Sequence, residues 1–392
     1  MRKIRKDRPK RVAISLEMDW GYKRHLETYA GCQRYANEFG WNSVITPNSP
    51  RILKAEDGKL PFDGILARAT EPLAEAAVEM GVPLVNVWLN SPAKNVPSVL
   101  PDFEESGRMA ADHLLGRGFR RFAYLGFQRE KDAGSQLKGL REVLRPKGFG
   151  ISTYRFSRTG LEGNAPGWEK FVAGLEKWVE TWATPIGVFV GNDLYCRYLI
   201  ETCRTKGLQV PQEVAIVGTS DESAICSSPY PTLTSIDMDF QRIGYRAAEA
   251  LDSLMNGEPA PSASEYCLPK ALIPRQSTDS RSADDPVVSK ALRFIGENGQ
   301  ERIQVDDVVL ATGINRRTLE RRFRASMGRS IAEEITRLRI ERSKRLMMET
   351  DASFKSLAVD LGFRNADHFC KVFGRIEKIS PSQYRKREKR KG

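Results

Sequence analysis

The chain has 392 residues, of which 40% are hydrophobic, so two or three globular domains with real cores are expected. This composition excludes a wholly disordered chain, and apolar stretches such as Val12–Leu16 and Pro185–Val190 are far shorter than the roughly 20 residues of a membrane-spanning helix. The formal net charge of +12 is uneven: from Pro286 onward, 25 Lys and Arg face 14 Asp and Glu, a net +11, whereas residues 12–285 are net −5. A basic C-terminal quarter behind an acidic body indicates two separate tasks, one of them with a polyanion.

The N-terminal arm and the cysteines further limit which class of protein this is. Residues 1–11 form a basic arm that leads into a short apolar run and not into a secretory signal. The six cysteines have no CxxC spacing, and with only three histidines no metal site is expected. We therefore expect reduced packing cysteines in a cytoplasmic protein, with no membrane contact, no metal and no cofactor.

From Val12 to about Ala271, short apolar runs alternate with amphipathic ones. Strands are predicted at 12–16, 43–46, 64–67, 84–87, 122–125, 187–190 and 214–217, and helices at 22–39, 73–80, 105–117, 136–144 and 195–206. Continuous apolar strands between such helices indicate an α/β fold with parallel sheets covered by helices on both faces. Ligands of such folds lie at the carboxyl ends of the strands.

The loops after these strands are rich in carboxylates and aromatic rings. The candidate ligand-binding residues there are Glu17, Asp19, Trp20, Tyr22, Trp88, Asp193 and Asp221. Carboxylates accept hydrogen bonds from hydroxyl groups and aromatic faces cover sugar C–H groups, so this set suits a polyol. The alternative is that about half of them are helix caps or surface residues, and Asp193 in particular precedes a helix that it would cap.

Two segments resemble the effector domains of the LacI/GalR repressors and periplasmic sugar-binding proteins. They are Pro101–Gly126 and Gly187–Ile236, the second with Asn192-Asp193, Val217-Gly218 and Pro231-Thr232-Leu233-Thr234. The resemblance covers most of residues 12–271, within an effector domain of residues 12–275, and implies two lobes that close on a small ligand held by Asp193. Two positions depart from the family: Ser220 precedes Asp221 where Gly-x-Asp is usual, and Gln136 stands where a sugar-binding arginine is common.

A polar segment follows this domain. Residues 276–286 contain QSTDSRSADD and then Pro286, which predicts a linker that ends where a helix starts, with Asp284 and Asp285 as caps.

The last hundred residues contain an internal duplication. Val305–Ser330 parallels Ser353–Ser380, with Gly313 matching Gly362 at an offset of 49 and Phe323 matching Phe373 at an offset of 50. Each copy reads as a helix, a glycine turn with an apolar residue after it, and a second helix, which is typical of a helix-turn-helix unit. The segment 330–350 between them predicts a helix of about 19 residues that begins with a Ser330–Glu333 capping box. Such a helix is long enough to place two recognition helices in successive major-groove windows.

The second helix of each copy offers side chains for base contacts. The first, Asn315–Ser326, carries Arg316, Arg317, Thr318, Glu320, Arg321 and Arg322, and the second, Asn365–Gly374, carries Asn365, Ala366, Asp367, His368 and Lys371. Arg317 and Arg321 lie four residues apart on one side, where each can bind guanine bidentately. Arg322 is expected either to contact phosphate or to be partly structural, and His368 to be a surface residue.

This arrangement, ending in Ser380–Lys386, resembles the DNA-binding domain of AraC/XylS-type transcription activators, from about Val287 to Arg387, within a domain of residues 287–392. Lys378 departs from the family, which has Gly there. A LacI-like domain before an AraC-like one resembles regulators of xylose utilisation. The resemblance implies a dimeric activator that binds double-stranded operator DNA, responds to D-xylose and contacts RNA polymerase. The alternatives are a repressor sensing another ligand, or a solute-binding module without regulatory output. No catalytic motif indicates an enzyme.

Overall fold

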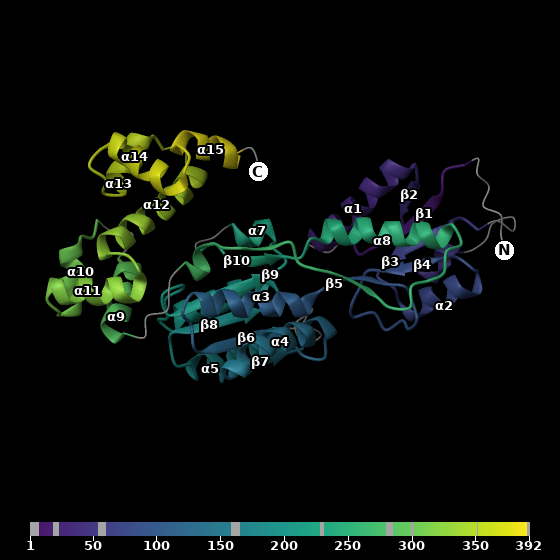
Figure 1. The fold of residues 1–392 in the computed structure, drawn as a ribbon, viewed down its shortest axis with the longest axis horizontal. Coiled ribbons are helices and arrows are strands. Elements are labelled where there is room, and N and C mark those ends of the chain that lie inside the picture. Colours follow the sequence, from purple (N-terminus) through teal and green to yellow (C-terminus); the bar gives the residue numbers. More distant parts are fainter. Residues whose placement is uncertain are drawn as a thin grey trace.

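The computed structural model describes residues 8–18, 23–53, 60–157, 165–227, 231–279, 285–298, 302–350 and 352–389. Figure 1 shows two α/β lobes that follow one another along the long axis, with a helical C-terminal domain beside the second lobe. The α/β class with parallel sheets and a C-terminal all-α domain is therefore confirmed.

The first lobe is a four-stranded parallel sheet in the order β2-β1-β3-β4. Its strands are β1 (Arg11–Ser15), β2 (Asn42–Ile45), β3 (Gly64–Ala67) and β4 (Leu84–Asn86), and its helices are α1 (Lys23–Phe39), α2 (Glu71–Glu79) and α8 (Phe240–Met255). Strands β3 and β4 are buried along their whole length, as the continuous apolar runs predicted. Helix α8 comes from much later in the chain and lies alongside α1 (Figure 1).

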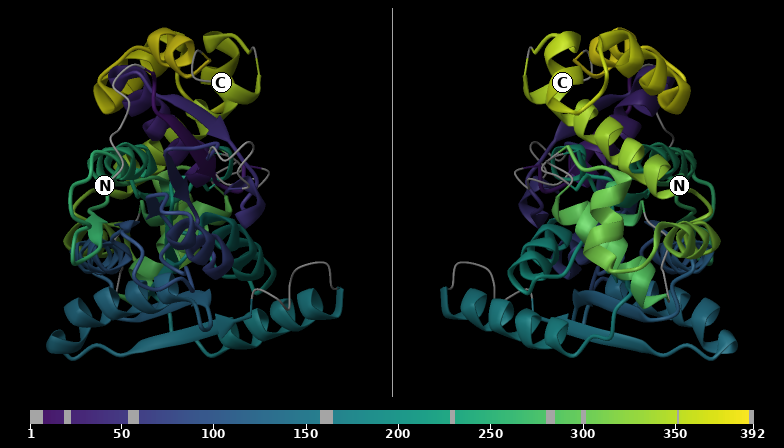
Figure 2. Two further views of the ribbon diagram at one scale, coloured as in Figure 1. Left: turned by 90° about the vertical axis from the view of Figure 1, so that its right-hand side faces the viewer. Right: turned by 90° about the vertical axis from the view of Figure 1, so that its left-hand side faces the viewer.

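The second lobe is a six-stranded sheet in the order β12-β10-β9-β8-β6-β7, parallel except for β12. The strands are β6 (Phe122–Phe127), β7 (Ile151–Phe156), β8 (Ile186–Val190), β9 (Val214–Thr219), β10 (Thr234–Asp237) and β12 (Ala271–Ile273). Its helices are α3 (Phe103–Gly116), α4 (Lys131–Leu144), α5 (Ala165–Glu180), α6 (Asp193–Thr205) and the short α7 (Ser223–Cys226). Helix α5, in teal, lies on the side of the molecule opposite α13 to α15, in yellow (Figure 2).

The chain passes between the lobes three times. It crosses after β5 (Val99–Pro101), after β10, and after β11 (Glu265–Cys267), and β5 and β11 pair as a separate two-stranded parallel ribbon. These three adjacent crossings form the hinge region.

In each lobe, two helices pack closely against each other at a pair of glycines. A Cβ added at Gly31 of α1 or at Gly244 of α8 would lie 1.9 Å from a backbone oxygen of the facing helix. In the second lobe, the corresponding distances are 2.1 Å for Gly107 of α3 and 1.8 Å for Gly139 of α4. The backbones of the paired helices are therefore in contact, and a side chain at any of these positions would force them apart.

The C-terminal domain contains two small helical cores joined by one helix. The helices are α9 (Pro286–Glu297), α10 (Val305–Thr312), α11 (Arg316–Met327), α12 (Ile331–Glu349), α13 (Phe354–Asp360), α14 (Ala366–Glu377) and α15 (Pro381–Lys389). The first half of α12 contributes Ile331 and Ile335 to one core, and its second half contributes Ile340 and Met347 to the other. The predicted capping box at its start is present, since Ser330 N donates to Glu333 and Glu333 N donates to Ser330.

The linker differs from the prediction. Residues Gln276–Thr278 form a buried 3-10 turn of the second lobe, where Ser277 Oγ donates to Ile216 O at 2.6 Å and His113 bonds to Thr278 at 2.8 Å. Polar residues there satisfy buried backbone groups, a role that composition alone does not distinguish from a linker. The carboxylate of Asp279 then pairs with Arg337 of α12, so the second lobe contacts the C-terminal domain directly. Helix α9 begins at Pro286 with Asp285 as its cap, as predicted, and Asp284 lies outside the described residues.

Candidate functional site

The first recognition helix, α11, presents a cationic face to solvent. Its apolar face is fixed by Leu319 and Phe323, which are completely buried. This packing leaves Arg317, Arg321 and Arg324 exposed on the outside of the helix. Asn315 caps the helix, accepting from Thr318 N at 2.9 Å, so Thr318 lies in the first turn. Glu320 is half-buried beside Arg321 at the edge of a hollow of about 650 Å³ that reaches Ser330.

The second recognition helix, α14, has the same construction with a weaker charge. Phe369 and Phe373 are buried, while Asn365, Asp367, His368 and Lys371 are exposed and Ala366 is partly exposed. Asn365 Oδ1 accepts from His368 N at 2.8 Å, so the Asn365 side chain serves as the helix cap. The exposed set offers both donors and acceptors for base edges.

Two arginines of α11 are held by carboxylates of the protein. Arg322 binds Asp285 through two bonds, of 2.6 and 2.7 Å, and the same carboxylate caps α9 through Val287 N. Arg316 pairs with Asp306 at 2.9 Å on the surface. Because such an exposed ion pair is weak, a DNA phosphate can readily replace the carboxylate as the partner of Arg316. Of the two roles left open for Arg322, the structure supports the structural one, because its donors join two helices.

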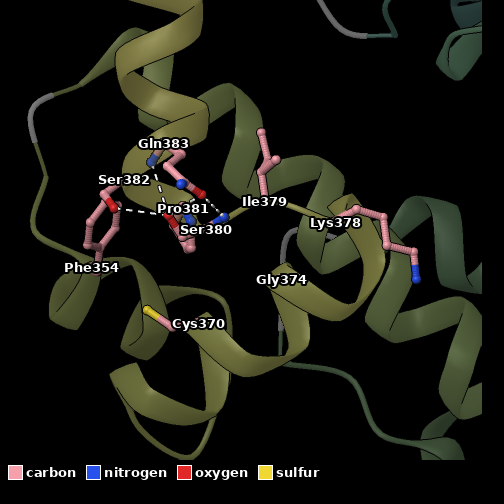
Figure 3. A pocket seen from close by; sticks show the side chains of 9 residues that line it. All are labelled: Phe354, Cys370, Gly374, Lys378, Ile379, Ser380, Pro381, Ser382 and Gln383. Atoms are coloured by element: carbon pink, nitrogen blue, oxygen red, sulfur yellow. Dashed lines mark hydrogen bonds between the residues drawn. The ribbon is translucent and has the colours of Figure 1, made fainter.

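A hollow of about 390 Å³ lies beside the second unit, and Figure 3 shows its lining. Phe354 and Cys370 lie on one side of it, and Ser380 and Gln383 form a reciprocal cap at the start of α15 on another. The Lys378 side chain points away from the hollow (Figure 3). Lys378 ends α14 in the left-handed conformation, with φ 62°, where the first unit has Gly328 with φ 69°. The backbone turn that Gly allows is thus kept in spite of the substitution.

We expect Lys378→Gly to stabilise the C-terminal domain by about 0.5–1 kcal/mol, because glycine adopts this conformation without the steric cost that a Cβ incurs. Guanidinium denaturation followed by hydrogen exchange in α13 to α15 measures it. Gly328→Ala is the matched control and should destabilise the first unit by a similar amount. Equal stability of Lys378→Gly and the native protein would show that Lys378 makes a contact that compensates for the strain.

A second candidate site lies between the two lobes, where two small cavities adjoin. Arg24, Phe103 and Asp132 line both. The first cavity, of about 40 Å³, also contacts Arg68, Trp88 and Asn90, and the second, of about 20 Å³, contacts Gln136, Asn192 and Ser220. Each volume suits one or two water molecules, so a sugar requires the walls to move apart.

The predicted ligand-binding residues are only partly brought together here. Trp88, Gln136 and Ser220 line the cavities. Glu17 forms an ion pair with Arg68, whose guanidinium stacks on the Trp88 ring at 4.2 Å, so Glu17 acts on the site through Arg68. Asp19, Trp20 and Tyr22 lie outside the described residues.

Asp193, the predicted ligand contact, makes its hydrogen bonds within the protein in this structure. Its side chain is completely buried behind the cavity wall. One carboxylate oxygen accepts from Ser235 Oγ at 2.7 Å and the other from Glu222 N at 2.9 Å. Burial raises the pKa of Asp193 to about 7, against the lowering effect of these bonds. Asp193 therefore positions the loop after β9, and it is Asn192 that caps α6, accepting from Leu194 N at 2.9 Å.

Asp221 is likewise engaged within the protein. Its carboxylate pairs with Arg275 at 2.7 Å, and its backbone N donates to Ser235 Oγ at 3.0 Å. Ser220 and Asp221 both have positive φ, 108° and 53°. The departure from Gly-x-Asp thus places Ser220 at the cavity wall with a positive φ, a conformation that persists only where the surroundings enforce it, and Asp221 follows it directly.

Sequence reasoning missed several residues that line the cavities. Asn90 lies in the loop after β4 and Asp132 in the first turn of α4, both just beyond the carboxyl ends of predicted strands, so that signal was present. Arg24 lies inside α1, and nothing in the pattern distinguishes it from a surface arginine. His25, beside it, donates from Nδ1 to Glu17 O at 2.5 Å, and burial lowers its pKa to about 4, so it is neutral at pH 7.

Comparison with known proteins agrees with this architecture. Residues 111–278 match the family described as periplasmic binding protein-like domain, and residues 309–387 match the family described as helix-turn-helix domain. The second match spans both helix-turn-helix units, in the duplicated arrangement of AraC-type domains. The chain is a DNA-binding transcription regulator with an AraC-type domain.

Two relatives match the regulator along most of its length. It is 26% identical to the xylose operon regulatory protein of Escherichia coli K12 over 382 residues, 96% of each chain. It is 27% identical over 335 residues to the Haemophilus influenzae protein of the same name, covering 83% of this chain and 86% of that one. Its fold matches the solved structure of xylose-binding transcription activator xylR, with a TM-score of 0.75, 22% identity, and coverage of 97% and 98%.

These relatives are transcription regulators, in agreement with the expectation that the chain is not an enzyme. Within the part of the chain that the structure describes, no cluster of three or more His, Cys, Asp or Glu is arranged to hold a metal ion. Among the same residues, every helix is too short or too polar to cross a membrane.

Proposed function

We propose that the regulator is a sugar-responsive activator of xylose-utilisation genes. The observation that carries the proposal is the covalent joining of a two-lobed domain, with a polar cleft at the carboxyl ends of its strands, to a duplicated helix-turn-helix domain. The names of the two relatives that cover most of the chain support D-xylose as the effector. The cleft residues Trp88, Asn90 and Asp132 offer a ring face, an amide and a carboxylate to such a polyol.

An effector changes DNA binding only if it binds two arrangements of the protein with different affinity. We infer that the sugar favours one arrangement of the lobes. The second lobe would transmit this change of arrangement to the C-terminal domain through the Asp279–Arg337 contact and the segment before α9. In a homodimer, two C-terminal domains would then occupy paired half-sites beside RNA polymerase.

The test is operator affinity measured with and without D-xylose, L-arabinose, D-ribose and D-glucose, by fluorescence anisotropy on promoter fragments from the protein's own genome. A change with xylose alone supports the proposal. A change with another sugar only would identify a different effector. Unchanged affinity with all four would remove the sugar-sensing function, and repression of a reporter gene by the ligand-free protein would favour the repressor alternative.

Base reading by α11 gives a second expected result. Arg321→Ala should weaken binding to a cognate site by about 1–3 kcal/mol and relax base preference there, because an exposed arginine on this face can bind guanine bidentately. Arg322→Ala should lower domain stability but keep base preference, since Arg322 is bound to Asp285. Anisotropy on cognate and random duplexes measures both. An equal loss on random DNA would show that Arg321 contacts only phosphate.

A further inference from the structure

The N-terminus of α4 in the second lobe is capped by a residue of the first lobe. Its own N-cap residue, Glu130, makes no side-chain capping bond. Instead, Asn90 Oδ1 accepts from Lys131 N at 2.7 Å and from Asp132 N at 3.3 Å. The Asn90 amide group donates in turn to Glu130 Oε2 at 2.5 Å. This cap therefore bridges the cleft.

Asn90 is firmly part of the first lobe. It follows β4, and its neighbour Ser91 donates to Ala69 O at 2.6 Å. Ala93 and Val96, a few residues later, pack on the apolar core of that lobe. The backbone oxygen of Ser91 also accepts from Lys131 Nζ at 2.9 Å, which adds a third bond across the same gap.

The N-terminus of α1 in the first lobe is capped from the opposite direction. Lys23 N, the first amide of this helix, donates to both carboxylate oxygens of Glu222, at 2.9 and 3.0 Å. Glu222 belongs to the second lobe, where it follows β9 and precedes α7. It is 6% exposed, and its own backbone N donates to the Asp193 carboxylate, so its position is fixed.

We propose that these two reciprocal caps, Asn90 on α4 and Glu222 on α1, form a clasp that holds the two lobes closed without any ligand. Helix N-terminal amides have no partner within their own helix, so a cap stabilises the arrangement that supplies it. Bonds of 2.7 to 3.3 Å are lost after a small rotation about the hinge, so both caps act only in the closed form. Opening returns the amides to water and the nearly buried Glu222 carboxylate to solvent.

The clasp also flanks the cavities. Asn90 and Asp132 line the first cavity, and Ser220, two residues before Glu222, lines the second. Because a sugar requires these walls to move apart, the clasp would oppose ligand entry, and its strength would set how small the population of the ligand-competent form is. This inference does not depend on the identity of the ligand.

The test uses the full chain without sugar or DNA, with fluorophores on noncanonical amino acids at Val78 of α2 and Lys177 of α5. Both positions are exposed, one on each lobe. Single-molecule energy transfer gives the ratio of closed to open molecules. Asn90→Ala and Glu222→Ala should each lower this ratio by about fivefold, which is the typical effect of losing one cap. The double variant should lower it further.

Glu201→Ala is the matched control, because Glu201 is an exposed carboxylate of the second lobe that pairs with Arg204 of its own helix. It should leave the ratio unchanged. Glu222→Gln keeps the side-chain volume and one acceptor oxygen, so it serves if Glu222→Ala does not fold, and it should give a smaller shift. A native ratio in the folded double variant would overturn the clasp. Failure of the sugar to alter DNA binding would contradict the proposed function but not the clasp.

Discussion

Gly139→Ala is expected to destabilise the second lobe by about 3 kcal/mol, near the upper end for overpacking, because α3 and α4 touch through their backbones at this point. The added Cβ would lie 1.8 Å from the carbonyl oxygen of Glu104, and neither of these backbones can move without separating the helices. The same separation would break two ion pairs that join α3 to α4 beside the contact, Glu104 with Lys138 and Arg108 with Glu142. Denaturation followed by tryptophan fluorescence measures the loss.

The same helix provides the control. Gly134 of α4 is exposed, and a Cβ there would meet no atom within 4 Å. Gly134→Ala should therefore stabilise the protein by about 0.5–1 kcal/mol through helix propensity alone. All six tryptophans precede Pro185, so their fluorescence reports only on the two lobes. Similar effects of the two variants would contradict the close helix contact.

Glu334→Ala is expected to destabilise the C-terminal domain by about 3 kcal/mol, the low end of what removing one partner of a buried ion pair costs. The Glu334 side chain is fully buried at the start of α12 and binds Arg337 at 2.8 Å as well as Arg329. Its loss leaves two largely buried guanidinium groups without their shared carboxylate. Hydrogen exchange in α11 and α12 measures the change, since this domain contains no tryptophan.

The effect of this substitution should depend on pH. Burial alone would raise the pKa of Glu334, but Arg337 and Arg329 outweigh it and hold that pKa below its ordinary value of 4.5. A carboxyl group whose pKa is lower in the folded state contributes stability above its unfolded pKa and loses it as pH falls. The difference between native protein and variant should thus be full at pH 7 and shrink below about pH 4.5. The adjacent Glu333→Ala removes an exposed capping residue and should cost clearly less stability than Glu334→Ala. Equal losses for the two variants would show that only capping matters.

Sequence reasoning succeeded where a local pattern has one structural meaning. The duplicated helix–glycine–helix spacing placed α10, α11, α13 and α14, and the Ser330–Glu333 pair placed the start of α12. It missed α8, although Phe240, Ile243, Ala247 and Leu251 recur at helical spacing, so this omission was avoidable. Strand β7 was also not predicted, but its sequence gives a weaker signal. It lies at the edge of its sheet, and buried and exposed residues alternate only weakly along it, with one fully buried residue.

The remaining features depend on partners that lie far apart in the chain. Asp193 and Arg322 have side chains suited to a sugar and to DNA, and only the fold shows that Ser235 and Asp285 already bind them. The caps from Asn90 and Glu222 join residues 41 and 199 positions apart. No spacing rule connects such positions, because their proximity results from the packing of the two lobes.

The three crossings between the lobes have a consequence for proteolysis. A protease that cuts one crossing leaves the lobes connected by the other two, so a single cut cannot release either lobe. The first lobe also needs α8, and the second needs β12 and Gln276–Thr278, which come after it in the chain. Neither lobe can therefore be obtained as one uninterrupted fragment. By contrast, a single cut between Asp279 and Asp285 would divide the chain into two complete folding units: the paired lobes, and the helices that read DNA.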